Sequence, residues 1–212
     1  MKENVNLNRK KEYDKIDTAV NIIKDGGIVV FPTETVYGIG ADCLNEKAIR
    51  KLYEVKRRPL SKKISLLVGS KEMLEQFTQN LSNQEKKLIE EFFPGPLTLV
   101  LHKKTIIPDL LTNNEDIVGF RMPKNKIALD LINSVGNPIA TSSANRAGEA
   151  SGVDLEDIKN VFKEEVDFYI DGGKSEIGFG STIVQIIDKK PVLIREGIIT
   201  KEDIERVLKE VE

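Results

Sequence analysis

The chain contains 212 residues, of which 40% are hydrophobic and 31% are charged, a balance that predicts a globular domain with its own core and argues against a disordered protein. Its 32 Lys and Arg against 34 Asp and Glu give a formal charge of −2, which argues against a surface that coats nucleic acid as a whole but allows a local basic groove. Cys43 is the single cysteine and His102 the single histidine, so an internal disulfide and a zinc site built from Cys and His are both excluded.

The first third of the chain predicts two helices and two strands. The apolar residues of 14–25 share one helical face, and Asn45 caps a second helix that ends in a basic stretch. Strands are predicted over 28–31 and 65–68. After the first of these strands, a loop is expected as far as Asp42.

The middle of the chain predicts three helices and three strands. A capping box from Ser82 to Glu85 opens the second of two consecutive helices. A third helix over roughly 124–135 ends at Gly136, since glycine is the usual residue just beyond a helix. The strands are predicted over 97–101, 117–122 and 138–142.

The last third predicts two further helices and a hairpin. Asp154 caps one helix, and Thr200 caps a final amphipathic helix over 200–212. Residues 166–171 are strand-like. The strand 181–187 is expected to pair with 191–196 across a short turn.

Strands and helices alternate without repeats, low-complexity tracts or a linker. Several strands are joined by connections short enough for hairpins, which favours a mixed sheet over a purely parallel one. We therefore expect a single domain over 1–212, with a core from about 15 to 200.

The termini and the apolar runs bear on localisation. The first residues are polar and lack the apolar stretch of a signal peptide. No run approaches the roughly 18 uncharged apolar residues of a membrane helix. A cytoplasmic protein without membrane contact is expected.

Four irregular segments near strand ends are unusually polar, and loops at strand ends are where binding residues concentrate. Their small side chains and glycines leave backbone N–H groups free to approach oxyanions. The segments are 32–41, 56–63, 141–152 and 171–182.

Cations in these regions have two interpretations. The segment 56–63 carries five cations, and either a solvated helix end or a contact with polyphosphate or RNA would account for them. Arg121 stands in an otherwise apolar strand, and Arg195 ends another. Each could face solvent or bind a carboxylate through a bidentate guanidinium contact.

Several well-known motifs are absent. Gly173-Lys174-Ser175 resembles the end of a Walker A loop, but Phe168 stands where the first glycine is required. Neither GIGADC nor GFGSTI contains the third glycine of a dinucleotide-binding motif. Ser142 and Ser143 lack a histidine base, which argues against serine-hydrolase chemistry.

Taken in order, seven motifs between about 15 and 200 resemble the YrdC family, the threonylcarbamoyl-AMP synthases. They are PTETVYGIGA after a strand, K-x-R-P, FPGPLTLVL, a strand ending R-x-P, S-A-N followed by S-G, GSTIV and I-R-E-G. The resemblance implies an α+β fold, with a twisted, largely antiparallel mixed sheet and flanking helices around a concave cleft (YrdC/RibB-like).

The resemblance also implies an activity. Members of the family make threonylcarbamoyl-AMP from L-threonine, bicarbonate or CO2 and ATP, with Mg²⁺ bound to ATP and release of pyrophosphate. A separate tRNA threonylcarbamoyl transferase complex then modifies an adenosine of tRNA, and a direct contact between this protein and tRNA is left open.

Site residues follow by the same resemblance. The threonine pocket would consist of Thr35, Arg121, Thr141 and Ser181. The ATP side would consist of Lys56, Arg58, Lys62, Ser143, Asn145, Ser151 and Arg195, with Lys56 and Arg58 assigned to catalysis, and no metal-ligating residues are expected.

Two alternatives stay open. One is a non-catalytic RNA-binding module, although aromatic residues for base stacking are few at 6%. The other is a paralogue with a different amino acid or carbamoyl donor, because Leu67 and Thr141-Ser142 depart from the family pattern near the threonine pocket.

Overall fold

The computed structural model describes residues 15–209, and their nine strands form one sheet in the order β7-β1-β2-β6-β3-β5-β4-β8-β9. The strands are β1 (Val29–Phe31), β2 (Gly38–Asp42), β3 (Ser65–Leu67), β4 (Leu97–His102), β5 (Ile117–Arg121), β6 (Ile139–Ser143), β7 (Phe168–Tyr169), β8 (Thr182–Ile187) and β9 (Lys190–Arg195). Five neighbouring pairs are antiparallel, and the pairs β1–β7, β3–β5 and β4–β8 are parallel. The expected mixed, largely antiparallel sheet is confirmed.

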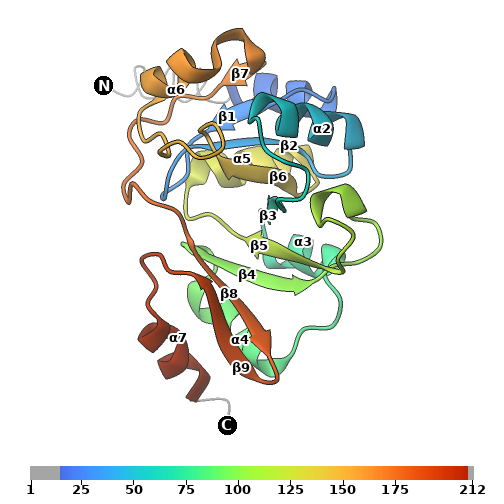
Figure 1. The fold of residues 1–212 in the computed structure, drawn as a ribbon, viewed down its shortest axis with the longest axis vertical. Helices are drawn as coiled ribbons and strands as arrows, with labels where there is room; N and C mark the ends of the chain where they lie inside the picture. Colours follow the sequence, from blue (N-terminus) through green and yellow to red (C-terminus); the bar gives the residue numbers. More distant parts are fainter. Residues whose placement is uncertain (1–14, 210–212) are drawn as a thin grey trace, which may run out of the picture.

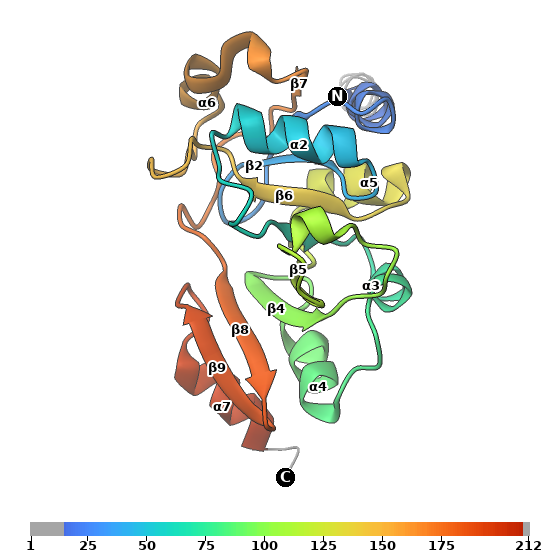
Figure 2. The same ribbon diagram turned by 45° about the vertical axis from the view of Figure 1, so that its right-hand side comes forward.

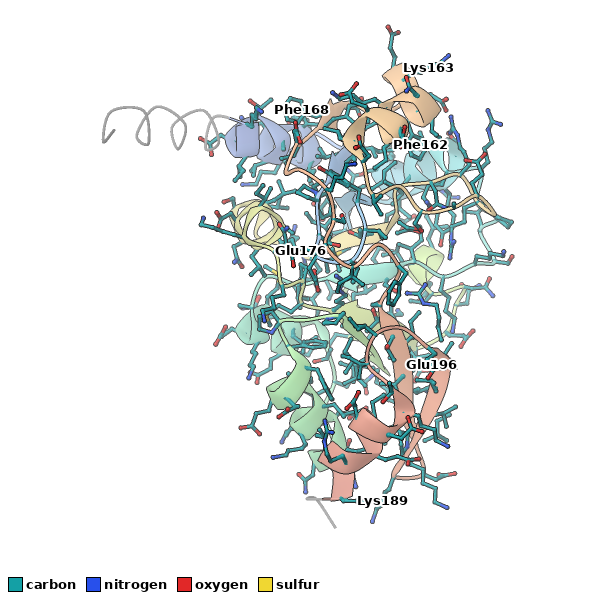
Figure 3. All side chains as sticks on the ribbon, turned by 90° about the vertical axis from the view of Figure 1, so that its left-hand side faces the viewer. Phe162, Lys163, Phe168, Glu176, Lys189 and Glu196 are labelled. Atoms are coloured by element: carbon teal, nitrogen blue, oxygen red, sulfur yellow. The ribbon has the colours of Figure 1, made fainter. Side chains whose placement is uncertain are left out.

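Helices flank the sheet along its whole length (Figures 1 and 2). Besides a helix over 15–24, they are α2 (Glu46–Val55), α3 (Lys71–Phe77), α4 (Asn83–Phe92), α5 (Lys126–Val135), α6 (Leu155–Phe162) and α7 (Lys201–Leu208), with short 3-10 turns η1 (Asp109–Leu111) and η2 (Lys163–Glu165). In Figure 1, α2, α5 and α6 lie around the end that carries β7, and α4 and α7 lie beside the β8–β9 hairpin. Figure 3 shows Phe162 and Phe168 at the first end and Lys189, in the hairpin turn, at the other.

The helix caps that the sequence predicts are present. Asn45 and Asp154 each accept a backbone N–H of the first helical turn, and Gly136 ends α5 with a left-handed φ of 86°. Reciprocal capping boxes open α4 at Ser82 and α7 at Thr200. Because each cap satisfies N–H or C=O groups that the helix leaves without partners, these residues fix where the helices begin and end.

One sequence prediction is wrong, because the expected loop up to Asp42 contains strand β2, which pairs with both β1 and β6. Its glycines suggested a loop, but they serve close packing between strands. A Cβ added at Gly38 would lie 2.8 Å from Thr141 Cγ2, and one at Gly40 would lie 2.6 Å from Ile139 Cγ2. Glycine in this strand therefore marks close approach of a neighbouring strand.

The ends of the chain bear on two further predictions. Asp14 and the last residues of the predicted helix over 200–212 lie outside the described residues. Among residues 15–209, the helices are all too short or too polar to cross a membrane.

Candidate active site

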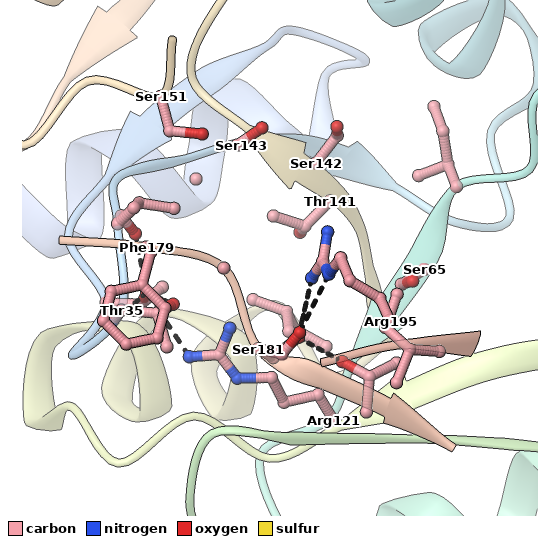
Figure 4. Close-up of a pocket in the computed structure, with 18 of the residues that line it drawn as sticks. Thr35, Ser65, Arg121, Thr141, Ser142, Ser143, Ser151, Phe179, Ser181 and Arg195 are labelled. Carbon is pink, nitrogen blue, oxygen red and sulfur yellow. Dashed lines mark hydrogen bonds between the residues drawn. The ribbon is translucent and has the colours of Figure 1, made fainter. Parts of the chain in front are cut away.

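A cavity of about 350 Å³ lies on the middle of the sheet, where seven strands contribute lining residues (Figure 4). The strands are β2 to β6, β8 and β9, and the segment between β1 and β2 also lines the wall. In Figure 4, Ser143 and Ser151 lie on one side of the cavity and Arg121 and Ser181 on the other. The cavity thus joins segments that are far apart in the sequence.

The cavity gathers eight of the eleven residues that the sequence assigns to the site. These are Thr35, Arg58, Arg121, Thr141, Ser143, Ser151, Ser181 and Arg195. Lys56, Lys62 and Asn145 do not line it. The threonine-side residues are all present in the lining, and the three exceptions all belong to the ATP side.

Arg121 ends strand β5 and is held in the wall of the cavity by an ion pair and hydrogen bonds. Its side chain is 9% exposed, and its Nε donates to the Gly95 carbonyl at 3.2 Å. Its Nη2 lies 2.8 Å from Glu34 Oε2 and 3.5 Å from the hydroxyl of Thr33. Burial lowers the pKa of Arg121 and the Glu34 carboxylate opposes that effect, so the guanidinium remains a cation at neutral pH.

Glu34 is itself buried, and its Oε1 accepts no hydrogen bond within the described residues. A buried carboxylate is costly unless it is paired, so Arg121 and Glu34 stabilise each other. Arg121, which the sequence analysis assigns to the carboxylate of threonine, therefore already forms an ion pair with a carboxylate of the protein itself.

Ser181 and Arg195 form a second polar group beside Arg121. The hydroxyls of Ser181 and Thr98 lie 2.7 Å apart. Arg195 donates from Nε and Nη2 to the Ser181 carbonyl, at 2.9 and 2.7 Å. Burial and the charge of Arg121 lower the pKa of Arg195. Arg121 and Arg195 are thus two neighbouring cations in the wall of the cavity.

Strand β6 supplies the opposite wall and leads into the turn after it. Thr141 Oγ1 donates to the Ile139 carbonyl, and Ser143 Oγ lies 2.5 Å from Asn145 Oδ1. Asn145 also donates from Nδ2 to the carbonyls of Arg146 and Glu149. Asn145 thus supports the turn that carries Ser143 instead of lining the cavity.

Lys56 also points into the protein. The side chain is 1% exposed, and Nζ donates to the carbonyls of Ser143 and Asn145 at 2.5 and 2.7 Å. Burial, with smaller contributions from the cations Arg58 and Arg146, lowers the pKa of Lys56 to about 7. The lysine connects the C-terminal end of α2 to the turn after β6.

The rest of the basic segment divides between the cavity and the surface. Arg58 donates from Nε and Nη2 to the carbonyls of Lys62 and Lys63, and its guanidinium lines the cavity. Lys62 is exposed and lies outside the cavity lining. Its neighbour Lys63 does line the cavity and forms an ion pair with Glu115 at 2.5 Å.

Comparison with known proteins identifies the family of this chain. A family model named for Sua5, YciO and YrdC, and described as telomere recombination, matches residues 21–197. This chain belongs to the Sua5–YciO–YrdC family.

Individual members of the family show how far the similarity extends. A threonylcarbamoyl-AMP synthase of Pyrococcus abyssi is 38% identical over 207 residues, which cover 98% of this chain and 61% of that protein. A relative from Methanocaldococcus jannaschii is 39% identical over 193 residues, with 91% of this chain and 90% of the relative covered. The structure of P. abyssi Sua5 complexed with L-threonine matches with a TM-score of 0.89 at 39% identity, covering 92% of this chain and 57% of that one.

Sequence reasoning missed several residues that line the cavity of this family member. Ser65 and Thr98 are polar residues within the apolar strands β3 and β4, and that irregularity was the signal for them. Phe179 also lines the cavity with its ring 49% exposed, between Gly178 and Gly180. An exposed aromatic between two glycines was a usable signal as well, because large apolar side chains at the mouth of a cavity are typical of ligand sites.

The side chains suited to a metal ion are few. Within residues 15–209, His, Cys, Asp and Glu form no group of three or more that could hold an ion. Among the lining residues, Glu196 carries the sole carboxylate, and it follows β9 (Figure 3). This donor set fits Mg²⁺ that arrives bound to a triphosphate, since Mg²⁺ commonly takes one or two protein carboxylates together with phosphate oxygens and water.

Proposed function

We propose that this protein makes threonylcarbamoyl-AMP from L-threonine, CO2 or bicarbonate and ATP, with release of pyrophosphate. The supporting observation is a single cavity in which Arg58 and Arg195 lie with Arg121 and the hydroxyls of Thr141 and Ser181. A cavity of this kind can hold a phosphate tail beside a small hydroxylated amino acid. The threonine-bound relative gives further support.

The amino-acid end has the side chains that threonine requires. Arg121 offers N–H groups to a carboxylate, and Glu34 behind it fixes the guanidinium in place. Thr35 and Thr141 supply hydroxyls of the size and polarity that suit the threonine side chain. Leu67, also in the lining, adds an apolar contact for the methyl group.

The nucleotide end is cationic and rich in small hydroxyl side chains. Arg58 and Lys63 face the cavity, with Ser143 and Ser151 on the adjoining wall. Arginine binds phosphate oxygens through two parallel hydrogen bonds, and serine hydroxyls donate to them at close range. Lys56 and Asn145 contribute by holding the turn of Ser143 in shape.

The reaction needs no protein nucleophile. The threonine amine and CO2 form a carbamate with loss of a proton. A carbamate oxygen then attacks the α-phosphorus of ATP, and the bond to the β-phosphate oxygen breaks to release pyrophosphate. The chain orients the two anions and screens their charge, a large contribution because two unit charges about 4 Å apart repel by roughly 4 kcal/mol at an effective dielectric of 20.

Mg²⁺ would enter with the nucleotide, and Glu196 is the cavity residue able to add a carboxylate ligand. The bound ion would neutralise phosphate charge. Because the product is a mixed anhydride that water hydrolyses, the described loops around the cavity would also protect it.

The product would pass to a tRNA threonylcarbamoyl transferase complex, with direct contact to tRNA at the basic segment 56–63. ATP and tRNA are intracellular, so the proposed reaction takes place in the cytoplasm. These partners are inferred from the chemistry of the product and from the family.

The decisive test supplies the purified protein with ATP, Mg²⁺ and bicarbonate and varies the amino acid. Release of pyrophosphate that depends on threonine, with threonylcarbamoyl-AMP detected by mass spectrometry, is the expected result. Salt-sensitive RNA binding without any ATP consumption would establish the non-catalytic alternative instead. Turnover with another amino acid would identify a paralogue of different specificity.

A further inference from the structure

A second, smaller pocket of about 230 Å³ lies on the outside of the basic segment. It is lined by Arg50, Tyr53, Glu54, Arg57, Arg58 and Leu60. Arg58 belongs to the walls of both this pocket and the cavity, so one residue borders the two spaces. The cationic character of the cavity thus continues to the surface.

Two of the three arginines of this outer pocket, Arg50 and Arg57, are free to bind a ligand, whereas Arg58 donates to the carbonyls of Lys62 and Lys63. Neither the Arg50 nor the Arg57 side chain has a hydrogen bond or an ion pair within residues 15–209. Glu54 is the single acid in the lining. Glu165, which also lies in the field of Arg57, is already paired with Arg146.

The backbone at Arg57 adds a second observation. Arg57 N–H bonds to the Glu54 carbonyl and Arg58 N–H bonds to the Tyr53 carbonyl, both at 2.9 Å, which is the Schellman arrangement after a helix. Arg57 occupies the left-handed position of that motif, with φ of 50°, where glycine is usual because a Cβ is disfavoured. An arginine here gives up backbone stability and places a cation at the pocket.

We propose that this outer pocket is a second phosphate-binding site that receives pyrophosphate as it leaves the cavity past Arg58. The inference rests on the proposed function. Pyrophosphate is a compact polyanion, and the guanidiniums of Arg50 and Arg57 offer the bidentate contacts that phosphate oxygens prefer, while Arg58 adds its positive charge. A relay of this kind would shorten the time for which product anions occupy the cationic cavity.

The test is calorimetric titration of pyrophosphate, carried out with and without saturating α,β-methylene-ATP, so that it needs no turnover. With the cavity filled by the analogue, the wild-type protein is expected to bind pyrophosphate still. Arg57→Gly and Arg50→Gln should each weaken that binding about ten-fold, the effect of losing one charge-assisted contact. Glu54→Gln should tighten it, because the single acid of the pocket is removed.

Two controls separate binding from folding. Arg57→Gly should keep or raise the melting temperature, since glycine relieves the left-handed backbone, so weaker binding would not result from unfolding. Lys47→Gln removes an exposed cation from the same helix outside the pocket and should leave pyrophosphate affinity unchanged.

The outcomes also separate this inference from the proposed function. Failure of the ATP analogue to bind would overturn the proposed function, and the titration without analogue would still compare Arg57→Gly with wild type. Absence of pyrophosphate binding to the analogue-saturated protein, or equal affinity in Arg57→Gly and wild type, would overturn the outer site. If these variants weaken only the binding of a tRNA hairpin, the pocket docks RNA and the pyrophosphate assignment is wrong.

Discussion

The two ends of the cavity are built differently. At the amino-acid end, Arg121, Thr141 and Ser181 lie on or next to central strands, and all three are buried. At the nucleotide end, Arg58 and Lys63 belong to an irregular segment, and both are partly exposed. The pairing of strands fixes the first set, whereas hydrogen bonds from Arg58 to the carbonyls of its own segment shape the second.

This difference bears on how each end can change. A residue on a central strand cannot move without disturbing the sheet, so the amino-acid end is organised before its ligand arrives. A segment held by a few exposed hydrogen bonds can adjust, which suits a triphosphate that enters and a pyrophosphate that leaves. Substitutions at the amino-acid end should therefore affect both stability and binding, and those at the nucleotide end mainly turnover.

The largest effect is expected from Arg121→Ala. The change removes the guanidinium that binds the carboxylate of threonine. It also leaves Glu34 buried without its partner, which should lower the free energy of unfolding by about 3 kcal/mol. The KM for threonine should rise about 100-fold, equivalent to about 2.7 kcal/mol, as measured by pyrophosphate release. The double variant Arg121→Ala with Glu34→Gln should regain stability without regaining threonine affinity. If ATP affinity falls instead and the threonine requirement stays normal, the two ends have been assigned the wrong way round.

The next effect concerns stability at Lys56. Its pKa is lowered to about 7 in the folded protein, from an ordinary 10.5 in the unfolded chain. Between these values the unfolded chain binds a proton that the folded protein does not, so the free energy of unfolding should increase as pH rises. From pH 6 to pH 9 the increase should be about 3 kcal/mol relative to Lys56→Met, which lacks the titrating group. Parallel pH profiles for the two proteins in denaturant unfolding would show that Lys56 is not held as described.

Arg58→Ala tests the nucleotide end. The loss of a cation that faces the phosphate tail should lower threonine-dependent pyrophosphate release about ten-fold, while the unfolding free energy changes by less than about 1 kcal/mol. Arg58→Lys keeps the charge but cannot reproduce both hydrogen bonds to the carbonyls of Lys62 and Lys63, and it should regain part of the rate. Wild-type turnover in Arg58→Ala would show that Arg58 does not bind the phosphates of ATP.

The sequence predicted what depends on local chemistry. Caps such as Asn45 and Thr200 were predicted correctly because a cap depends only on a hydrogen bond between a side chain and a backbone N–H a few residues away. Strand β2 was missed because its glycines resemble a loop, and their purpose, contact with Thr141 and Ile139, becomes apparent only once the strands are paired.

The same limit applies to the site. Arg121 was placed in the site by resemblance, because an arginine in a strand gives no sign of which face it occupies until its partner Glu34 is seen. Lys56 was expected at the phosphates, but a cation beside Arg58 can equally turn inward to carbonyls, as it does. A sequence pattern identifies a charge and leaves its direction open.

The smallest effects distinguish Lys62 from Lys63 within the nucleotide end. Lys62 is exposed and outside the cavity lining, so Lys62→Ala should change the KM for ATP by less than about two-fold, the usual consequence of removing a surface charge. Lys63 lines the cavity but pairs with the half-exposed Glu115, which offsets its charge, so Lys63→Ala should raise that KM only about three-fold. Glu115→Gln frees Lys63 and should lower the KM for ATP. Combined with Lys62→Ala, it should lower that KM by the same factor as it does alone. A larger rise of the KM for ATP in Lys62→Ala than in Lys63→Ala would mean that the exposed segment rearranges around the nucleotide. The hydrogen bonds of Arg58 would then not fix this end of the cavity when ATP binds.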